Sequence, residues 1–361
     1  MWPVTPDAPR RRARRSRPDG PVTLDDVARE AGVSLATASR VLNGSSRVVG
    51  EALRERVHAA AAQLDYSANA QAQAMARGRS GVVGLVVHDI ADPYFSSLAA
   101  GVTARAEASD VIVTLAVTGG DPVRELQHVA TLRRQRVRAV LLAGSRWADE
   151  ESTDALRAEL DAFRASGGQV AAVTQDVLGV DTVLIDNVGA ARRLSEAMVG
   201  IGYREFVLLE GPEDLLTARE RTAGFLAGLR AHGIEPVAHL AGPFTRDGAY
   251  ASTEEFLARG PLPRVEGRRP LLMAANDVMA VGALAAARDA GVDVPADLAI
   301  SGFDDIPTLR DVAPALTTVR LPLRGIGEAV FDLVVADGDG PLRRERFEGE
   351  VLVRASTPPQ T

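Results

Sequence analysis

The spacing of apolar residues changes near Gly81. Before this residue, apolar side chains recur every three or four positions, which is the period of amphipathic helices. After it, short apolar runs alternate with longer amphipathic stretches. Such alternation is typical of parallel sheets flanked by helices, and there are too many units for one small sheet. The pattern therefore predicts a small all-α segment followed by an α/β body of two doubly wound lobes.

In the body, the runs expected as strands are 82–87, 111–117, 139–143, 206–209, 271–275 and 298–302. The stretches expected as helices are 91–108, 122–134, 190–200, 219–232 and 278–290. Doubly wound sheets bind ligands in a crevice at the carboxyl ends of their strands. We therefore expect a small-molecule site in the loops that follow the strands.

Residues 22–43 predict two short helices joined by a tight turn. Thr23 can cap the first helix with Asp26 as its capping-box partner, Gly32 supplies the turn, and Ser34 caps the second helix. The outward side chains of the second helix are Leu35, Ala36, Thr37, Ser39 and Arg40, and its inward ones are Ala38, Val41 and Leu42. A helix-turn-helix needs such a face to enter the DNA major groove. A purely structural helical hairpin is the alternative.

A third helix is expected over residues 51–64, and a short Ala- and Gln-rich segment follows it. The side chains of this helix expected to close a small core are Leu53, Val57, Ala60, Ala61 and Leu64. The segment at 69–77 is too short to form a stable helix alone. It precedes the charged residues 77–80, so a plain linker is one reading of it.

The run at 22–43 resembles the DNA-binding headpiece of the lactose-repressor (LacI/GalR) family of bacterial transcription regulators. Similar residues continue to position 69, and the resemblance covers nearly all of 22–357. It implies a headpiece at 22–67, a hinge helix at 68–80, and two lobes like those of periplasmic sugar-binding proteins. The N-terminal lobe would comprise 81–186 and 319–346, and the C-terminal lobe 187–318 and 347–361. The chain would cross between them near residues 186, 318 and 346.

The resemblance also implies how operator DNA is bound. Leu35 and Ala36 would touch thymine methyl groups, and Arg40 would read guanine. Thr37, Ser39 and Asn43 would position phosphates, and Thr23 and Ser34 complete the headpiece contacts. The hinge residues expected at DNA are Asn69, Ala72 and Met75. Met75 holds the place of a side chain that the family wedges between base steps of the minor groove.

Candidate effector residues follow the expected strands. Asp92, Tyr94 and Phe95 follow the first strand, with core packing of the two aromatic rings as the alternative. Arg221, Asn276 and Asp304 match family ligand-binding positions, and Phe244 matches a residue that stacks on the effector. Asp176 replaces a family Asp-Arg pair with a slip of one or two residues left open, and Asp277 can equally cap the next helix. Leu323 stands where the family often has an aromatic residue, which would weaken stacking.

These groups determine the expected ligand. Carboxylate, amide and guanidinium groups around an aromatic platform suit vicinal hydroxyls, so the expected effector is a sugar or polyol. A purine or another non-sugar co-repressor is the alternative.

Charge is unevenly distributed along the chain. The net charge is −7, yet residues 1–80 hold thirteen arginines against eight acidic residues. A basic N-terminal segment followed by an acidic body fits an N-terminal nucleic-acid-binding domain. The Arg-rich stretch 10–17 is read as a disordered basic tail at 1–21; an extra phosphate-binding arm and a segment upstream of the natural start are the alternatives. No apolar run reaches membrane-spanning length, no secretory signal is visible, and cysteine is absent, so a cytoplasmic address is expected.

Other function classes fit less well. The five histidines lack metal-ligand spacing, and no nucleophile elbow or Walker loop occurs, so neither an enzyme nor a cofactor is expected. A periplasmic binding protein would lack the helix pair, and an architectural DNA-binding protein would lack the acidic body. The chain stops five residues after Ser356 without a heptad extension, so a homodimer is expected. The prediction is a ligand-responsive repressor that a sugar releases from its operator.

Overall fold

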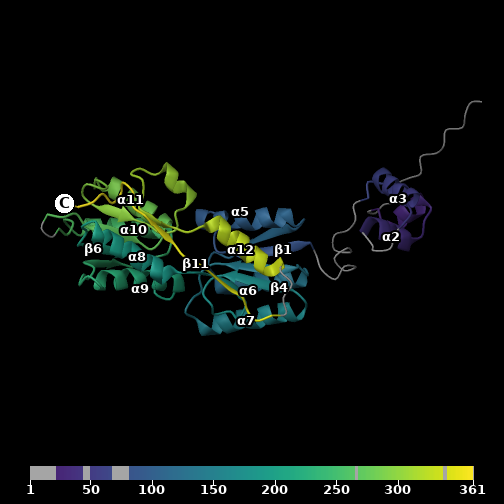
Figure 1. Ribbon diagram of the computed structural model, residues 1–361, viewed down its shortest axis with the longest axis horizontal. Coiled ribbons are helices and arrows are strands. Elements are labelled where there is room, and N and C mark those ends of the chain that lie inside the picture. The colour runs from purple at the N-terminus through teal and green to yellow at the C-terminus, as the bar shows by residue number, and fades with distance from the viewer. Residues whose placement is uncertain (1–21, 44–48, 67–80, 265–266, 336–339, 361) are drawn as a thin grey trace, which may run out of the picture. The chain divides into compact units, whose positions relative to one another are not determined.

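The computed structural model describes residues 22–43, 49–66, 81–264, 267–335 and 340–360. The chain forms two compact units, Met1–Ser80 and Gly81–Thr361 (Figure 1). The predicted tail at 1–21 and the hinge with Asn69, Ala72 and Met75 lie outside the described residues. In the described residues, no helix has the length and apolar character needed to cross a membrane.

The first unit begins with α1 (Leu24–Ala31) and α2 (Leu35–Asn43), followed by α3 (Glu51–Gln63). The predicted capping box is confirmed, because Asp26 N donates to Thr23 Oγ1 and Thr23 N donates to the Asp26 carboxylate. Gly32 turns the chain with a φ of 63°, in the left-handed region that favours glycine. Ser34 Oγ accepts a hydrogen bond of 3.2 Å from Thr37 N and so caps α2.

A small apolar core joins these three helices. Its buried side chains are Val27, Ala28, Ala31, Ala38, Val57, Ala60 and Ala61. Val41, Leu42 and Leu64 pack against it half-buried, as the pattern predicted. The prediction for Leu53 is wrong, since this side chain is 37% exposed. The buried face of α3 begins at Val57, one turn after Leu53.

The first lobe of the body is built on a parallel sheet of strand order β11-β5-β4-β3-β1-β2. The strands are β1 (Val82–Val87), β2 (Ile112–Val117), β3 (Ala139–Ala143), β4 (Gln169–Val173), β5 (Asp181–Ile185) and β11 (Arg344–Phe347). One apolar core lies under α5 (Pro93–Ala108) and α12 (Leu323–Val335). The other lies under α6 (Pro122–Arg134) and α7 (Glu150–Ala165). The sheet is therefore covered on both faces, as a parallel sheet requires.

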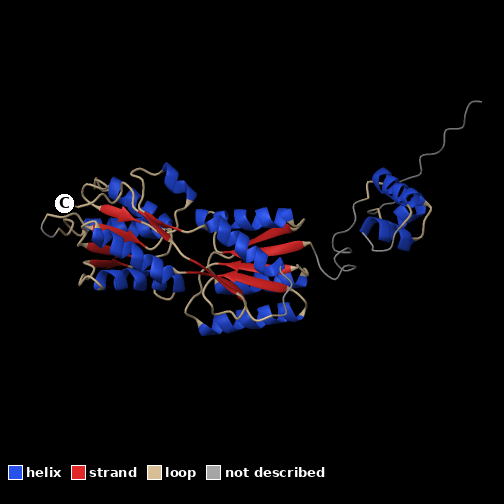
Figure 2. Ribbon diagram, in the orientation of Figure 1, coloured by secondary structure: helices blue, strands red, loops and turns tan. Residues whose placement is uncertain are grey.

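The second lobe repeats this design with a parallel sheet of order β7-β6-β8-β9. Its strands are β6 (Phe206–Leu209), β7 (Ala238–Leu240), β8 (Leu271–Ala274) and β9 (Ala299–Ser301). The helices are α8 (Asn187–Gly200), α9 (Leu216–Arg230), α10 (Arg246–Ala258) and α11 (Asp277–Asp289), followed by the 3₁₀ turn η1 (Pro307–Asp311). Figure 2 shows strands enclosed by helices in both lobes.

Three chain segments connect the lobes. They run from β5 to α8, from β10 (Thr318–Arg320) to α12, and from β11 to β12 (Glu350–Leu352). β10 pairs antiparallel with β12, and both contact α8 of the second lobe. The second crossing comes slightly later than residue 318, because β10 stays associated with the second lobe as far as Arg320. Three links between two lobes suit a hinge-like motion around a cleft.

Candidate effector cleft and DNA-binding face

A cleft of about 1580 Å³ lies where strand ends of the two lobes face each other. From the first lobe, residues after β1, β2, β3, β4 and β5 line it; from the second, residues after β6, β7, β8 and β9 do so. Doubly wound sheets bind ligands at this edge, because their loops diverge there and leave a crevice. The cleft is therefore the candidate effector site.

Arg221 lies on the side of the cleft that the second lobe forms. Its guanidinium is almost completely buried and donates from Nε to Asn187 Oδ1 at 3.0 Å. Nη1 donates to the carbonyl of Ala275 and Nη2 to Asp304 Oδ1, both at 2.8 Å. The group also lies 3.9 Å above the ring centroid of Phe303. Because a guanidinium has five N–H donors, this fixed arginine retains hydrogen-bonding capacity for a ligand.

Asp304 is the ion-pair partner of Arg221 and has an unusual backbone conformation. Its φ is 119°, which a non-glycine residue rarely adopts and which often marks functional loops. The backbone is held there by a hydrogen bond of 2.8 Å from Asp304 N to the carbonyl of Val319. Burial raises the pKa of the Asp304 carboxyl to about 7, and the nearby Arg221 opposes that rise. The carboxyl therefore titrates close to neutral pH.

Asn276 and Asp277 have different roles at the start of α11. The N-cap is Asn276, whose Oδ1 accepts from Met279 N at 2.8 Å, while its side-chain amide nitrogen has no hydrogen-bond partner among the described residues. Asp277 does not cap the helix. It is fully buried and accepts from Thr318 Oγ1 at 2.7 Å and from Ile306 N at 2.9 Å. Asp277 thus ties the loop after β9 to the crossover strand β10.

Asp277→Asn is expected to change how the stability of the body depends on pH. Burial raises the pKa of Asp277 from 3.8 to about 6, so between these values only the folded chain holds the proton. The contribution of Asp277 to the free energy of unfolding is therefore greatest below 3.8, its pKa in the unfolded chain. This contribution is lost as the pH rises through 6, its pKa in the folded chain. The difference between a pKa of 3.8 and one of about 6 corresponds to roughly 3 kcal/mol in the free energy of unfolding.

Urea unfolding of the wild type and the variant across this pH range is the measurement. Relative to the wild type, the variant should gain stability as the pH rises from about 4 to above 6. If the free energy of unfolding changed with pH in the same way in both proteins, the prediction would be contradicted.

The first lobe contributes the N-terminus of α5. Asp92 caps this helix by accepting from Tyr94 N at 2.9 Å, and Pro93 is its first residue. The rings of Tyr94 and Phe95 meet edge to face with centroids 5.0 Å apart. Both line the cleft, while Phe95 is also part of the apolar core. Burial raises the pKa of Asp92 and of the Tyr94 hydroxyl.

Of the other proposed effector residues, Phe244 and Asp176 also line the cleft and Leu323 does not. Asp176 is ion-paired with Arg344 of β11, so its carboxylate is already engaged. The placement expected for Leu323 is wrong, because this residue begins α12 and is buried in the core. Glycines at 101 and 327 bring α12 into close backbone contact with α5, which accounts for this burial.

Sequence reasoning missed many side chains that line the cleft, among them His88, Trp147, Gln175 and Glu220. Burial lowers the pKa of His88 to about 4, assisted by the charge of Arg146. Arg146 itself forms a buried bidentate pair with Glu125 at 2.6 and 2.8 Å. His88 directly follows β1, so the rule that ligands bind at strand ends could have identified it.

Several of these residues connect the lobes directly. Gln175 Nε2 donates to Thr217 Oγ1 at 3.0 Å and to Glu220 Oε2 at 3.1 Å. Trp147 forms a β-bridge with Leu215, and its indole nitrogen donates to the carbonyl of Gly120 at 2.9 Å. The aromatic ring of Trp147 is thus placed both on the cleft and at the contact between lobes.

In the first unit, α2 presents the predicted DNA-binding face. Leu35 is half exposed, and Ala36 and Arg40 are exposed. Thr37 and Ser39 are half-buried, and the hydroxyls of Ser34 and Thr37 lie 2.8 Å apart. Asn43 ends α2, but its side chain is outside the described part of the chain. The exposed small and basic side chains on the second helix fit a major groove.

A helix-turn-helix unit and a two-lobed cleft in one chain define a ligand-responsive DNA-binding regulator. Residues 23–69 match the model described as "Bacterial regulatory proteins, lacI family". Residues 196–357 match "Periplasmic binding protein-like domain". The chain belongs to the lacI family and is a ligand-responsive DNA-binding transcription regulator. This family consists of transcription regulators rather than enzymes.

Individual relatives agree along nearly the whole chain. The HTH-type transcriptional regulator GalS of Salmonella typhimurium is 32% identical over 325 residues, which are 89% of this chain and 91% of the relative. The crystal structure of the lac repressor dimer bound to operator and the anti-inducer ONPF has a TM-score of 0.80 and 27% identity, covering 94% of this chain and 100% of that chain. The transcriptional regulator CelR–cellobiose complex has a TM-score of 0.65 and 29% identity, covering 93% and 99%.

Proposed function

We propose that this protein represses transcription as a homodimer and that a carbohydrate bound in the cleft releases it from its operator. The observation that carries the proposal is the polar group Arg221, Asn276 and Asp304 on a cleft that also holds aromatic rings. Guanidinium, amide and carboxyl groups can pair with adjacent hydroxyls of one sugar ring. Apolar ring faces such as those of Tyr94 and Phe244 suit the C–H faces of a sugar.

The relatives support this assignment. The CelR structure contains cellobiose, and the lac repressor structure is a dimer on its operator. On α2, Leu35 and Ala36 would contact thymine methyl groups, and Arg40 would pair with guanine. Thr23, Ser34, Thr37, Ser39 and Asn43 would contact the phosphate backbone.

The contacts of Asp304 suggest how ligand binding reaches the connections between lobes. Asp304 N donates to the carbonyl of Val319, and Leu321 N donates to the carbonyl of Asp304 at 3.2 Å. A ligand that moves Asp304 therefore acts directly on the segment that leads from β10 to α12. A change in lobe angle would alter the spacing of the two DNA-binding units in a dimer and so weaken operator binding.

Operator release is the test. A site is first selected from random double-stranded DNA with the purified full chain, and binding is then measured by fluorescence anisotropy with cellobiose, galactose, lactose or ribose present. An effective sugar should weaken operator binding by about 5- to 150-fold, the usual range of allosteric coupling. Strengthened binding with hypoxanthine or guanine, and no effect of any sugar, would refute the carbohydrate assignment.

A further inference from the structure

Acidic groups outnumber basic groups on the described lining of the cleft. Seven carboxylates and four arginines lie there, and every one of these arginines is already ion-paired. The pairs are Arg221–Asp304 at 2.8 Å, Arg246–Asp247 at 2.8 Å, Arg346–Asp186 at 3.8 Å, and Arg344–Asp176. The remaining carboxylates, of Asp89, Asp92 and Glu220, form no ion pair within the described residues. An anionic ligand would thus meet excess negative charge.

The helix N-termini of both lobes are also occupied. Free backbone N–H groups at a helix start are a common phosphate-binding site. Here the first turns of α5, α6, α7 and α8 bind protein carboxylates, those of Asp92, Asp121, Asp149 and Asp186. Side chains of Thr245 and Asn276 cap α10 and α11.

The remaining helix of the second lobe, α9, has no side-chain cap, but the first lobe occupies its start. Leu216 N donates to the carbonyl of Arg146 at 2.8 Å, and Thr217 N donates to Ser145 Oγ at 2.9 Å. None of these seven α-helices, which begin at described strand ends, therefore offers its first turn to a phosphate.

The unpaired groups suit hydroxyls instead. Ionised carboxylates only accept hydrogen bonds, so a sugar hydroxyl can donate to them and a phosphate dianion cannot. The imidazole ring of His88 lies on the cleft wall between the glycines at 120 and 144, and its nitrogens form no hydrogen bond with the described residues. An uncharged imidazole has one donor nitrogen and one acceptor nitrogen, and a sugar hydroxyl can pair with either of them.

We infer that the cleft selects an uncharged sugar and rejects the phosphorylated form of the same sugar. The inference rests on the proposed carbohydrate ligand and narrows its chemical class. A sugar phosphate adds a charge of about −1.5 to −2 at neutral pH. Without a free arginine or helix start to receive that charge, the phosphorylated sugar should bind at least tenfold more weakly.

Tryptophan fluorescence gives a direct measurement. The chain has two tryptophans, so Trp2→Phe leaves Trp147 on the cleft as the sole reporter. The full-length variant is titrated, at constant ionic strength, with cellobiose and cellobiose 6′-phosphate, galactose and galactose 6-phosphate, and ribose and ribose 5-phosphate. A saturable change with an uncharged sugar and weaker binding of its phosphate is expected. Equal or tighter binding of the phosphate overturns the inference, as does a saturable response to inorganic phosphate alone.

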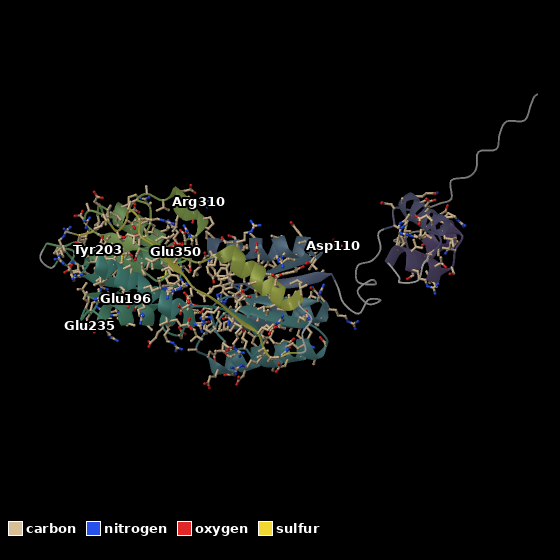
Figure 3. All side chains as sticks on the ribbon, viewed as in Figure 1. Asp110, Glu196, Tyr203, Glu235, Arg310 and Glu350 are labelled. Atoms are coloured by element: carbon tan, nitrogen blue, oxygen red, sulfur yellow. The ribbon has the colours of Figure 1, made fainter. Side chains whose placement is uncertain are left out.

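A charge variant tests the cause. Asp89→Asn with Asp92→Asn removes two unpaired charges, and asparagine still caps α5. In this variant, the dissociation constant of the phosphorylated sugar should move closer to that of the uncharged sugar. The matched control is Asp110→Asn with Glu235→Gln, which removes the same charge at opposite ends of the body (Figure 3). Neither of these residues lines the cleft. If the ratio of the two dissociation constants stays unchanged in the cleft variant, or changes equally in the control, the negative charge of the cleft is not the cause of the selection.

The same reporter separates this inference from the proposed function. If hypoxanthine alters the fluorescence and no sugar does, the carbohydrate assignment is wrong. Charge selection is then measured with inosine and inosine 5′-monophosphate. Tighter binding of the nucleotide overturns charge selection, and tighter binding of the nucleoside supports it with a different ligand class.

Discussion

Arg221→Ala is expected to remove the response to effector while leaving operator binding in place. The substitution deletes three hydrogen bonds on the cleft wall, to Asn187, Ala275 and Asp304. It also leaves the Asp304 carboxyl buried without its cation. Breaking a buried ion pair by removing one partner typically costs about 3–5 kcal/mol, so the body should also unfold at a lower temperature. The loss should be larger at pH 8 than at pH 6, because an ionised Asp304 is then unpaired.

Two further variants separate stability from ligand recognition. Arg221→Ala with Asp304→Asn removes the uncompensated charge and should recover much of the stability, but not the effector response. Arg221→Lys retains a charge but loses the planar fork that binds two acceptors at once, so it should respond weakly. Thermal unfolding and sugar-dependent operator binding are measured for each protein. A folded Arg221→Ala protein with the wild-type response would exclude Arg221 from the effector site.

The body elements predicted from sequence are those with a strong local signal. The apolar runs 82–87, 139–143 and 206–209 coincide with β1, β3 and β6, because a polar residue or a glycine bounds each run on both sides. The three-residue strands β7, β10 and β12 have no comparable pattern. The paired residues of β10 and β12 are 30 to 34 positions apart in the chain, and such pairing depends on tertiary structure. Sequence spacing therefore predicts the sheet interiors better than the crossovers between lobes.

The residues of the candidate site likewise differ in how far local sequence predicts their placement. Asn276 and Asp304 lie within three residues of the ends of β8 and β9, and the strand-end rule placed them on the cleft correctly. Asp277 sits beside Asn276 in sequence, yet its burial against Thr318 depends on a segment 41 residues away. The placement of Leu323 likewise depends on close packing between α12 and α5, which no local pattern shows. Local motifs thus identify the loops of a site, while long-range packing decides which side chains face the ligand.

Arg40→Ala is expected to abolish recognition of the operator sequence without disturbing the body. Arg40 is exposed on α2, and the capping bonds at Thr23 and Ser34 do not involve it. A bidentate arginine–guanine contact contributes about 1–3 kcal/mol of base discrimination. A dimer on two half-sites would lose that contribution twice, for a total of about 2–6 kcal/mol, whereas binding to random DNA should weaken only slightly.

The matched control is Arg54→Ala, which removes a charge of the same sign from α3, where Arg54 pairs with Glu51. Each variant removes one positive charge from the DNA-binding unit, so any general loss of electrostatic attraction to DNA should be similar in the two. Only Arg40→Ala should lose the preference for the selected site over a scrambled sequence. Thermal stabilisation by the effector should persist in both, since the cleft belongs to the other unit. If Arg40→Ala kept the wild-type sequence preference, base recognition would have to be assigned to other residues of α2.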